Sequence, residues 1–317
     1  MSYLSAPHFH DEKAAYRFVE QRVWANGRVC PHCGVVDKSG PLKGKSTRIG
    51  VYKCYACRKP FTVKVGTIFE ASKVKLHLWL QAIFLMASSK KGISSQQLHR
   101  TLGVTLKTAW FMSHRIREAM RSGALGPMGG GGKVVEADET YFGKVEKPET
   151  TRSDGQPYRR GKKQRGPANK RAVLSLVERG GQVRSFHVPR ADKVTVTRIV
   201  RENIDRESRL HTDGSRLYGG SAEHFASHET VDHAAGEYVR GDVHNNSAEG
   251  YFSVFKRGMR GTYQHCAEKH LHRYLAEFDF RFNNRMGLGV DDQARIDALV
   301  RGIVGKRLTY QTASARA

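Results

Sequence analysis

Two short cysteine motifs near the amino terminus constrain the fold of this chain more than any other feature. "CPHCG" supplies Cys30 and Cys33, and "CYAC" supplies Cys54 and Cys57, with twenty residues between the two motifs. Each motif presents two sulfurs from one tight turn, and two such turns complete a tetrahedron of thiolates, as in structural zinc sites. The spacing therefore predicts a zinc ribbon with structural Zn²⁺; buried or redox-active thiols are the alternative.

The charge of the chain points to a polyanionic partner. Among 317 residues, 54 Lys and Arg stand against 30 Asp and Glu, which gives a formal net charge of +24. Such an excess favours nucleic acid, because each phosphate contact releases condensed counterions. No apolar run reaches the length of a membrane span, and the first residues have no secretory pattern. We therefore expect a cytoplasmic, nucleoid-associated protein that binds DNA and no membrane.

The segment 71–123 has the pattern of several helices. Ser94 followed by Gln97 indicates a capping box at the start of one helix, Gly103 then makes a turn, and Thr105 caps the next helix. Two helices joined by a short turn are typical of a helix-turn-helix, whose second helix enters the major groove of DNA, although any antiparallel helix pair looks similar. The expected DNA contacts are the polar residues off the apolar stripe of the second helix: Lys107, Thr108, His114 and Arg115.

A glycine-rich stretch gives the clearest domain boundary. "ALGPMGGGGK" contains four consecutive glycines, which form a helix or strand only at a large entropic cost. Beyond it, strand patterns alternate with helical ones. The chain is thereby divided into a zinc ribbon with a short amino-terminal helix, a helical segment, a linker, an α/β domain and a basic carboxy-terminal tail, at residues 1–70, 71–123, 124–133, 134–285 and 286–317.

Acidic residues lie close to the ends of two predicted strands in the α/β domain. "KVVEADETYFGK" predicts a strand that carries Asp138 near its end, and "SRLHTDGSRLY" predicts a short strand that ends at Asp213. Glu139 would point to the opposite face of its strand from Asp138. Between these strands, "RAVLSLVERGGQVRSFHVP" has the pattern of a hairpin.

A third acidic residue stands in the stretch "DVHNNSAEGYFSVFKRG". If residues 246–256 form a helix, two stripes result. The polar stripe contains Asn246, Glu249, Ser253 and Lys256, and the apolar stripe contains Phe252, Phe255 and Met259. The alternative is that Glu249 and Lys256 only decorate a solvated helix.

Asp138, Asp213 and Glu249 together form a possible three-carboxylate site. Carboxylates without Cys or His suit a hard divalent ion such as Mg²⁺ or Mn²⁺, and a pair of such ions can clamp both oxygens of a phosphodiester displacement. Lys256 could hold a DNA phosphate beside the site. The alternative is that these acids are solvated turn residues.

From residue 138 to residue 285 the chain resembles the RNase H-like DDE transposases of bacterial insertion sequences, in the branch with an amino-terminal zinc ribbon. The resemblance rests on "ADETYFGK", "TDGSRLY" and "HNNSAEGYFSVFKRGMRGTYQHCAEKHLHRYLAEFDFRFNNR". It implies a multidomain α/β protein, with an RNase H-like mixed-sheet core preceded by the zinc ribbon and the helix-turn-helix segment.

The resemblance also implies roles for individual residues. Asp138 would be the first metal ligand on the first strand, Asp213 the second on the fourth strand, and Glu249 the third, with Asn246 as an alternative third ligand. Lys256 would match the lysine two helical turns after the third acid. A loop with ten Lys or Arg against three acids spans residues 143–171. Further expected DNA contacts are Arg159, Arg160, Lys162, Lys163, Lys256 and Arg257.

The implied function is that of a DNA transposase. Such an enzyme binds the terminal inverted repeats of its element, cleaves the ends and transfers the 3′-hydroxyls to target DNA. It acts as a homo-oligomer on paired ends and needs divalent metal but no nucleotide cofactor. The alternatives are an RNase H-fold nuclease or resolvase that does not join DNA, and a domesticated, non-catalytic DNA-binding regulator.

Overall fold

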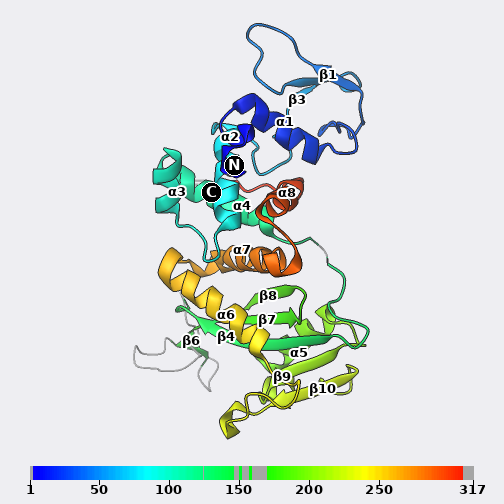
Figure 1. Cartoon of the computed structure of the whole chain (residues 1–317), viewed down its shortest axis with the longest axis vertical. Coiled ribbons are helices and arrows are strands. Elements are labelled where there is room, and N and C mark those ends of the chain that lie inside the picture. The colour runs from blue at the N-terminus through cyan, green and yellow to red at the C-terminus, as the bar shows by residue number, and fades with distance from the viewer. Residues whose placement is uncertain (1–2, 124, 146–149, 152–156, 159–169, 310–317) are drawn as a thin grey trace. The chain divides into compact units, whose positions relative to one another are not determined.

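The chain divides into two compact units in a computed structural model (Figure 1). The amino-terminal unit contains Met1–Arg121 and also Gly289–Ala317, and the central unit is Ser122–Leu288. Among the residues that the structure describes, no helix is long and apolar enough to cross a membrane. The described residues are 3–123, 125–145, 150–151, 157–158 and 170–309.

A small antiparallel sheet organises the ribbon part of the amino-terminal unit. Its strands are β1 (Ser39–Pro41), β2 (Tyr52–Cys54) and β3 (Pro60–Phe61), in the order β1-β2-β3. Trp24 packs edge-on against Tyr52 and Phe61, beside the second cysteine motif. The predicted short strands around that motif are therefore confirmed, although β3 ends sooner than the sequence pattern suggests.

The caps predicted in the helical segment are present. Ser94 accepts a hydrogen bond from Gln97 N at 3.1 Å, and Thr105 accepts one from Thr108 N at 3.2 Å. Gly103 ends the first of these helices with φ 63°, a left-handed conformation that glycine adopts without steric cost. The helices of this unit are α1 (Glu12–Val23), α2 (Leu76–Ser88), α3 (Ser95–Leu102), α4 (Leu106–Met120) and α8 (Asp292–Arg301).

Helix α8 corrects the sequence-based description of residues 286–317 as a basic tail. Asp291 caps this helix by accepting a hydrogen bond from Ala294 N at 2.7 Å. Ile296 and Leu299 are fully buried, and the helix contacts α1 and α2. The tertiary structure assigns this helix to the amino-terminal unit.

A five-stranded mixed sheet forms the centre of the second unit, in the order β10-β9-β4-β7-β8. Strands β4, β7 and β8 pair antiparallel, which confirms the predicted hairpin, whereas β9 runs parallel to β4 and β10 runs parallel to β9. A separate pair of short strands is formed by β5 (Thr150–Thr151) and β6 (Pro157–Tyr158). The strands of the main sheet are β4 (Val134–Phe142), β7 (Arg171–Glu178), β8 (Val183–Val188), β9 (Arg209–Asp213) and β10 (Ser227–Val231).

Helices cover both faces of this sheet (Figure 1). Strand β7 is buried on both sides, because Leu174 and Leu176 pack towards α5 while Val173 and Val177 pack towards α6 and α7. Two hydrophobic cores, one on each face, therefore hold the unit together. The helices are α5 (Lys193–Asn203), α6 (Asn246–Gly258) and α7 (Leu271–Asn283), and the π-helical turn Met259–Tyr263 follows α6.

The glycine-rich stretch is part of the central unit and packs beside the strands of its sheet. Met128 is buried and forms a parallel bridge with Ile204, and Gly130 N donates a hydrogen bond to Ser208 Oγ at 2.8 Å. Residues 129–132 all have positive φ angles, between 55° and 83°, which explains why glycine occupies each position. The glycines thus allow a close backbone approach to the sheet as well as a change of direction.

Candidate functional site

The four ribbon cysteines lie together in the geometry of a metal site. Their sulfurs all lie within 4.8 Å of one another, with 3.7 Å from Cys30 to Cys57 and 3.7 Å from Cys33 to Cys54. Zn–S bonds of about 2.3 Å in a tetrahedron place sulfurs roughly 3.8 Å apart, so the four residues fit Zn²⁺. The backbone N–H groups of Cys57 and Ala56 lower the pKa of the Cys54 thiol to about 7, whereas, against the lowering effect of the Val35 backbone, desolvation and the other three thiols raise the pKa of the Cys33 thiol to about 11.

Asp138 and Asp213 lie on adjacent parallel strands. The parallel pairing of β4 with β9 ends at Ala137 and Thr212, so the two aspartates occupy the next positions along their strands. The sequence pattern predicts Asp138 near the end of its strand. In the structure, β4 continues past Asp138 to Phe142, paired with β7. The site is therefore formed where β9 ends beside a longer neighbour.

Glu249 lies in the first turn of α6, which packs on β4. Both predicted stripes of this helix are confirmed: Asn246, Glu249 and Ser253 are exposed and Lys256 is half-buried, whereas Phe252, Phe255 and Met259 are buried. The Glu249 carboxylate is 3.9 Å from His233 Nδ1. The first turn of α6 thus presents both proposed third ligands, Asn246 and Glu249, to solvent.

The electrostatics connect the three acids. Burial, and after it the nearby carboxylates of Glu139, Asp213 and Glu249, together raise the pKa of Asp138 to about 8. The backbone N–H of Glu139 donates to Asp138 Oδ1 at 2.8 Å and opposes this shift. A buried carboxylate among other carboxylates favours a cation, and these oxygen donors suit Mg²⁺ or Mn²⁺. The donor chemistry of the three acids suits a divalent metal, but among the described residues only the four cysteines bring three or more ligand atoms within 4.8 Å of one another.

Glu139 contacts the body of the unit, as expected for a residue on the other face of the strand. It accepts a hydrogen bond from Tyr218 Oη at 2.8 Å, and Tyr218 is only 1% exposed. Burial raises the pKa of Glu139, whereas the hydrogen bond from Tyr218 lowers it. The sequence contained no signal for this tyrosine, because its role depends on the loop that follows β9.

The sequence analysis also did not predict a role for Glu136. It lies on β4 two residues before Asp138, is fully buried, and accepts hydrogen bonds from Ser247 N at 2.8 Å and Ala248 N at 3.0 Å. Arg179 Nε donates to the same carboxylate at 2.7 Å. A buried acid on a strand is a weak signal in sequence, since its partners are more than forty positions away.

The polar residues before α6 have structural partners. Asn245 is buried, and in the amide orientation that satisfies both ends it accepts from Asp213 N at 2.9 Å and donates to His211 O at 3.3 Å. Arg179 Nη2 lies 3.0 Å from His244 Nδ1 and 3.2 Å from His211 Nδ1. These contacts connect the start of α6 with β9 and with the end of β7.

The residues proposed for DNA contact in α4 have two different environments. Lys107 is exposed and Thr108 is half-buried in the first turn, whereas His114 is 1% and Arg115 is 5% exposed. The Arg115 guanidinium donates hydrogen bonds to the carbonyl oxygens of Ile68, Glu70 and Leu308. The structure therefore corrects the prediction for His114 and Arg115: as folded, these two side chains pack inside the unit.

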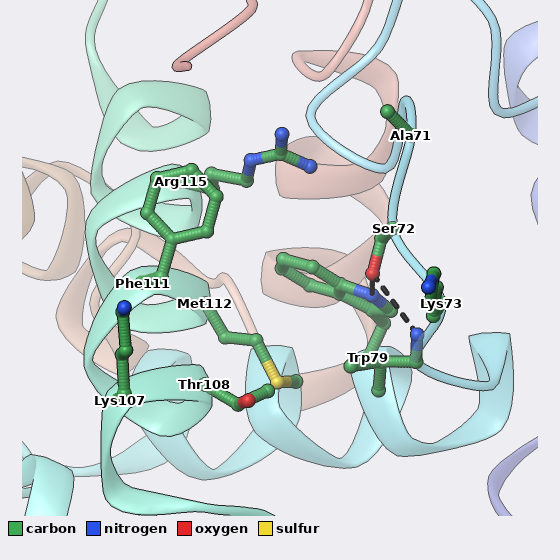
Figure 2. Close-up of a pocket in the computed structure, with 10 residues that line it drawn as sticks. Ala71, Ser72, Lys73, Trp79, Lys107, Thr108, Phe111, Met112 and Arg115 are labelled. Carbon is green, nitrogen blue, oxygen red and sulfur yellow. Dashed lines mark hydrogen bonds between the residues drawn. The ribbon is translucent and has the colours of Figure 1, made fainter. Parts of the chain in front are cut away.

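A pocket of about 370 Å³ opens beside the first turns of α4 (Figure 2). Lys107 and Thr108 on α4 face Lys73 and Trp79 across it, and Ser72 Oγ accepts a hydrogen bond from Trp79 Nε1 at 3.1 Å. The accessible end of α4 is thus bordered by cations and apolar rings. The lining residues are Ala71, Ser72, Lys73, Val74, Trp79, Lys107, Thr108, Phe111, Met112 and Arg115.

The remaining expected DNA contacts are on α6 and in the basic loop. Lys256 and Arg257 lie in the last turn of α6, where Arg257 Nε donates to Ser253 O at 3.2 Å. Four of the expected contacts lie outside the described residues: Arg159, Arg160, Lys162 and Lys163.

Comparison with known families assigns both parts of the chain. Residues 129–283 match the ISXO2-like transposase domain, and residues 10–60 match the transposase zinc-ribbon domain. The chain is 32% identical over 285 residues to an "Uncharacterized protein in transposable element ISH50" of Halobacterium salinarum, covering 86% of this chain and 91% of that protein. These matches identify the chain as a transposase. The chain belongs to the ISXO2-like transposase family.

This relative is archaeal, so the likeness to transposases of bacterial insertion sequences does not indicate that this chain comes from a bacterium. Among solved structures, the Mos1 Strand Transfer Complex matches with 11% identity and a TM-score of 0.22, covering 66% of this chain and 76% of that chain. The Mos1 mariner paired end complex with Mn matches with 10% identity and a TM-score of 0.18, covering 66% and 77%. Scores this low support no argument about fold or chemistry.

Proposed function

We propose that this transposase binds the terminal inverted repeats of its element, cleaves the element ends and joins the resulting 3′-hydroxyls to target DNA. The observation that carries the proposal is the position of Asp138 beside Asp213 on neighbouring strands, with Glu249 on a helix packed against one of those strands. Three carboxylates from distant parts of a transposase chain would suit metal-dependent phosphodiester chemistry when gathered around a cation.

Asp138, Asp213 and Glu249 would hold Mg²⁺ or Mn²⁺. When bound, the metal would act as a Lewis acid towards the attacking and leaving oxygens of the phosphodiester. The backbone of Asp138 is held by the pairing of β4 with β7, and that of Asp213 by the pairing of β9 with β10, so both side chains start from fixed backbone positions. The Glu249 side chain is exposed on the first turn of α6, where a DNA strand would have access to it. Asn246, in the same turn, is the alternative third ligand.

Lys256 would contact a DNA phosphate beside the acids. It follows Glu249 by seven residues on the same stripe of α6, which places the two side chains two turns apart. Its ammonium group would orient the backbone of the strand being cut. Attack on phosphorus by water or by a 3′-hydroxyl requires no covalent enzyme intermediate and no nucleotide cofactor.

The order of the strands supports an RNase H-like assignment for the central unit. Three antiparallel strands come first in the chain, and two further strands then add in parallel on the other side of the first one. Asp138 is on the first strand and Asp213 on the fourth of the main sheet, as the family likeness implies.

The amino-terminal unit would recognise the DNA ends. The net charge of +24 favours a phosphate-rich partner, and the accessible first turn of α4 carries Lys107 and Thr108, which line the pocket together with Lys73. α3 and α4, joined at Gly103, would serve as the helix-turn-helix, with the structural zinc holding the ribbon beside it. Family likeness further implies a homo-oligomer that pairs two ends.

A strand-transfer assay tests the proposal. Purified protein is mixed with a pre-cut element end and a plasmid target, in Mg²⁺, Mn²⁺ or EDTA, beside Glu249→Gln. Metal-dependent joined products that disappear in the variant are the expected result. Cleavage without joining would instead indicate a nuclease, and end binding without any chemistry would indicate a regulator.

A further inference from the structure

Helix α6 is capped from a distant strand. Within the described part of the chain, the residue before this helix, Asn245, makes no side-chain capping hydrogen bond. Glu136 of β4 supplies the cap, since its Oε2 accepts from Ser247 N at 2.8 Å and Ala248 N at 3.0 Å, across 111 positions of sequence. The first N–H groups of a helix have no partner inside the helix, and its dipole is positive there, so a carboxylate is the matching group.

The capping carboxylate is itself held in one place. Its Oε1 accepts from Arg179 Nε at 2.7 Å and from Ser247 Oγ at 3.0 Å, and His244 Nδ1 is 3.4 Å away. Glu136 is fully buried, and a buried charge persists only with such partners. Arg179 Nη2 also donates to His244 O at 2.9 Å, so the arginine connects the cap to the segment that leads into α6.

The hydrogen bonds from the first turn of α6 to Glu136 fix the distance between Glu249 and Asp138 in the proposed active site. Glu136 and Asp138 are two positions apart on the same strand and therefore face the same side of the sheet. Glu249 follows Ala248 directly, in the turn whose N–H groups Glu136 holds. Any slip of the first turn of α6 along β4 would therefore move Glu249 away from Asp138.

We propose that Glu136, held by Arg179, is a positioning residue that sets the location of Glu249 relative to Asp138 and thereby sets how tightly the site binds its divalent cation. The inference rests on the proposed function, because it takes these acids as metal ligands. It assigns Glu136 no contact with DNA or metal. Its effect is transmitted entirely through the first turn of α6.

Two variants and one matched control test this role. Glu136→Gln keeps the size of the side chain but removes the charge and one acceptor. The double variant Glu136→Gln with Arg179→Gln also removes the cation that would otherwise be left without its carboxylate, in case the single variant folds poorly. Asp192→Ala is the control, because Asp192 caps α5 by accepting from Thr195 N at 2.9 Å and α5 carries none of the proposed ligands.

Two measurements are made on each full-length protein. Hydrogen exchange reports whether the amides of Ser247 and Ala248 are protected, independently of any activity. The Mn²⁺ concentration that gives half-maximal strand transfer reports the affinity of the site. Loss of a residue that orients metal ligands typically weakens metal binding about 10–100-fold.

The expected result is fast exchange at the two amides and a half-maximal Mn²⁺ concentration raised at least about 10-fold in both Glu136 variants. The control should match wild type in both measurements. Unchanged protection of these amides, or an unchanged Mn²⁺ requirement in a folded variant, would overturn the proposal. If wild type itself joins no DNA, the proposed function fails, and the exchange measurement still decides whether Glu136 holds α6.

Discussion

Asp138 and Asp213 are neighbours across two parallel strands, one position beyond the last pair, Ala137 and Thr212. Adjacent strands lie about 4.8 Å apart, so the backbone alone brings two carboxylates together. Burial and the neighbouring carboxylates raise the pKa of Asp138 to about 8. Keeping these carboxylates close together costs free energy, and the proposed divalent cation would offset that cost.

Replacing Asp213 should remove the chemistry and spare DNA binding. In Asp213→Ala, strand transfer should fall at least about 100-fold. Removing a residue that only supports the metal ligands costs up to about 100-fold, and removing a ligand itself should cost at least as much. The affinity for an element end, measured by gel shift in EDTA, should stay near wild type, since Asp213 is not among the residues proposed to contact DNA. A variant that still cut DNA at the wild-type rate would remove Asp213 from the site.

The third ligand can be identified with two substitutions in one helical turn. We expect Glu249→Gln to lose at least about 100-fold in strand transfer, because a neutral amide binds a divalent cation less well than a carboxylate. Asn246→Ala should cost less than about 10-fold. Both residues are exposed, so neither change should alter the melting temperature. The reverse order of effects would make Asn246 the third ligand.

Removal of zinc should unfold the ribbon. Small zinc domains obtain about 10–16 kcal/mol from the metal, and the ribbon's core is a small cluster around Phe61 and two of its cysteines. Cys54→Ser should therefore reduce bound zinc, measured by elemental analysis, from about one ion per chain to a small fraction. Cys266→Ser is the control, because Cys266 packs in the central unit. Equal zinc content in both variants would contradict the assignment.

Replacing Lys107 should affect DNA binding, whereas replacing Arg115 should affect stability. Lys107→Ala should weaken end binding and reduce the slope of log affinity against log salt by about one, as expected for one lost phosphate contact, without lowering the melting temperature. Arg115→Ala should lower the melting temperature, because three backbone carbonyls lose their donor. A salt slope unchanged in Lys107→Ala would exclude that lysine from the interface.

Asp279 should make the stability of the central unit depend on pH. It accepts hydrogen bonds from Ser185 N at 2.9 Å and Tyr251 Oη at 2.5 Å, and burial raises its pKa from 3.8 to about 6. Because the folded pKa lies above the unfolded one, the stabilising contribution is complete below about pH 4 and is lost as the pH rises through 6. The full effect is at most about 3 kcal/mol.

The corresponding measurement compares wild type with Asp279→Asn by urea unfolding between pH 4 and pH 7.5. The difference in unfolding free energy, wild type minus variant, should fall as the pH rises and then level off above about pH 7. A difference that stays constant over this range would mean that Asp279 has the same pKa in the folded and unfolded chain.

Much of the local structure could be predicted because it depends on neighbours in sequence. The caps at Ser94 and Thr105, the hairpin around residues 180–181 and the two stripes of α6 all involve residues within a few positions of one another. The cysteine pairs are equally local, and their spacing alone predicted that the sulfurs converge. Exposure in α4 was predicted less well, since the burial of Arg115 depends on carbonyls up to 193 positions away.

By itself, then, the sequence predicted which residues would carry the chemistry and determined on which elements they lie, because residue type and period are local properties. The tertiary structure alone decided that β4 continues past Asp138, that α8 joins the amino-terminal unit, and that Glu136 caps α6. Each of these depends on pairing between distant segments, whose hydrogen bonds and buried area no local pattern specifies.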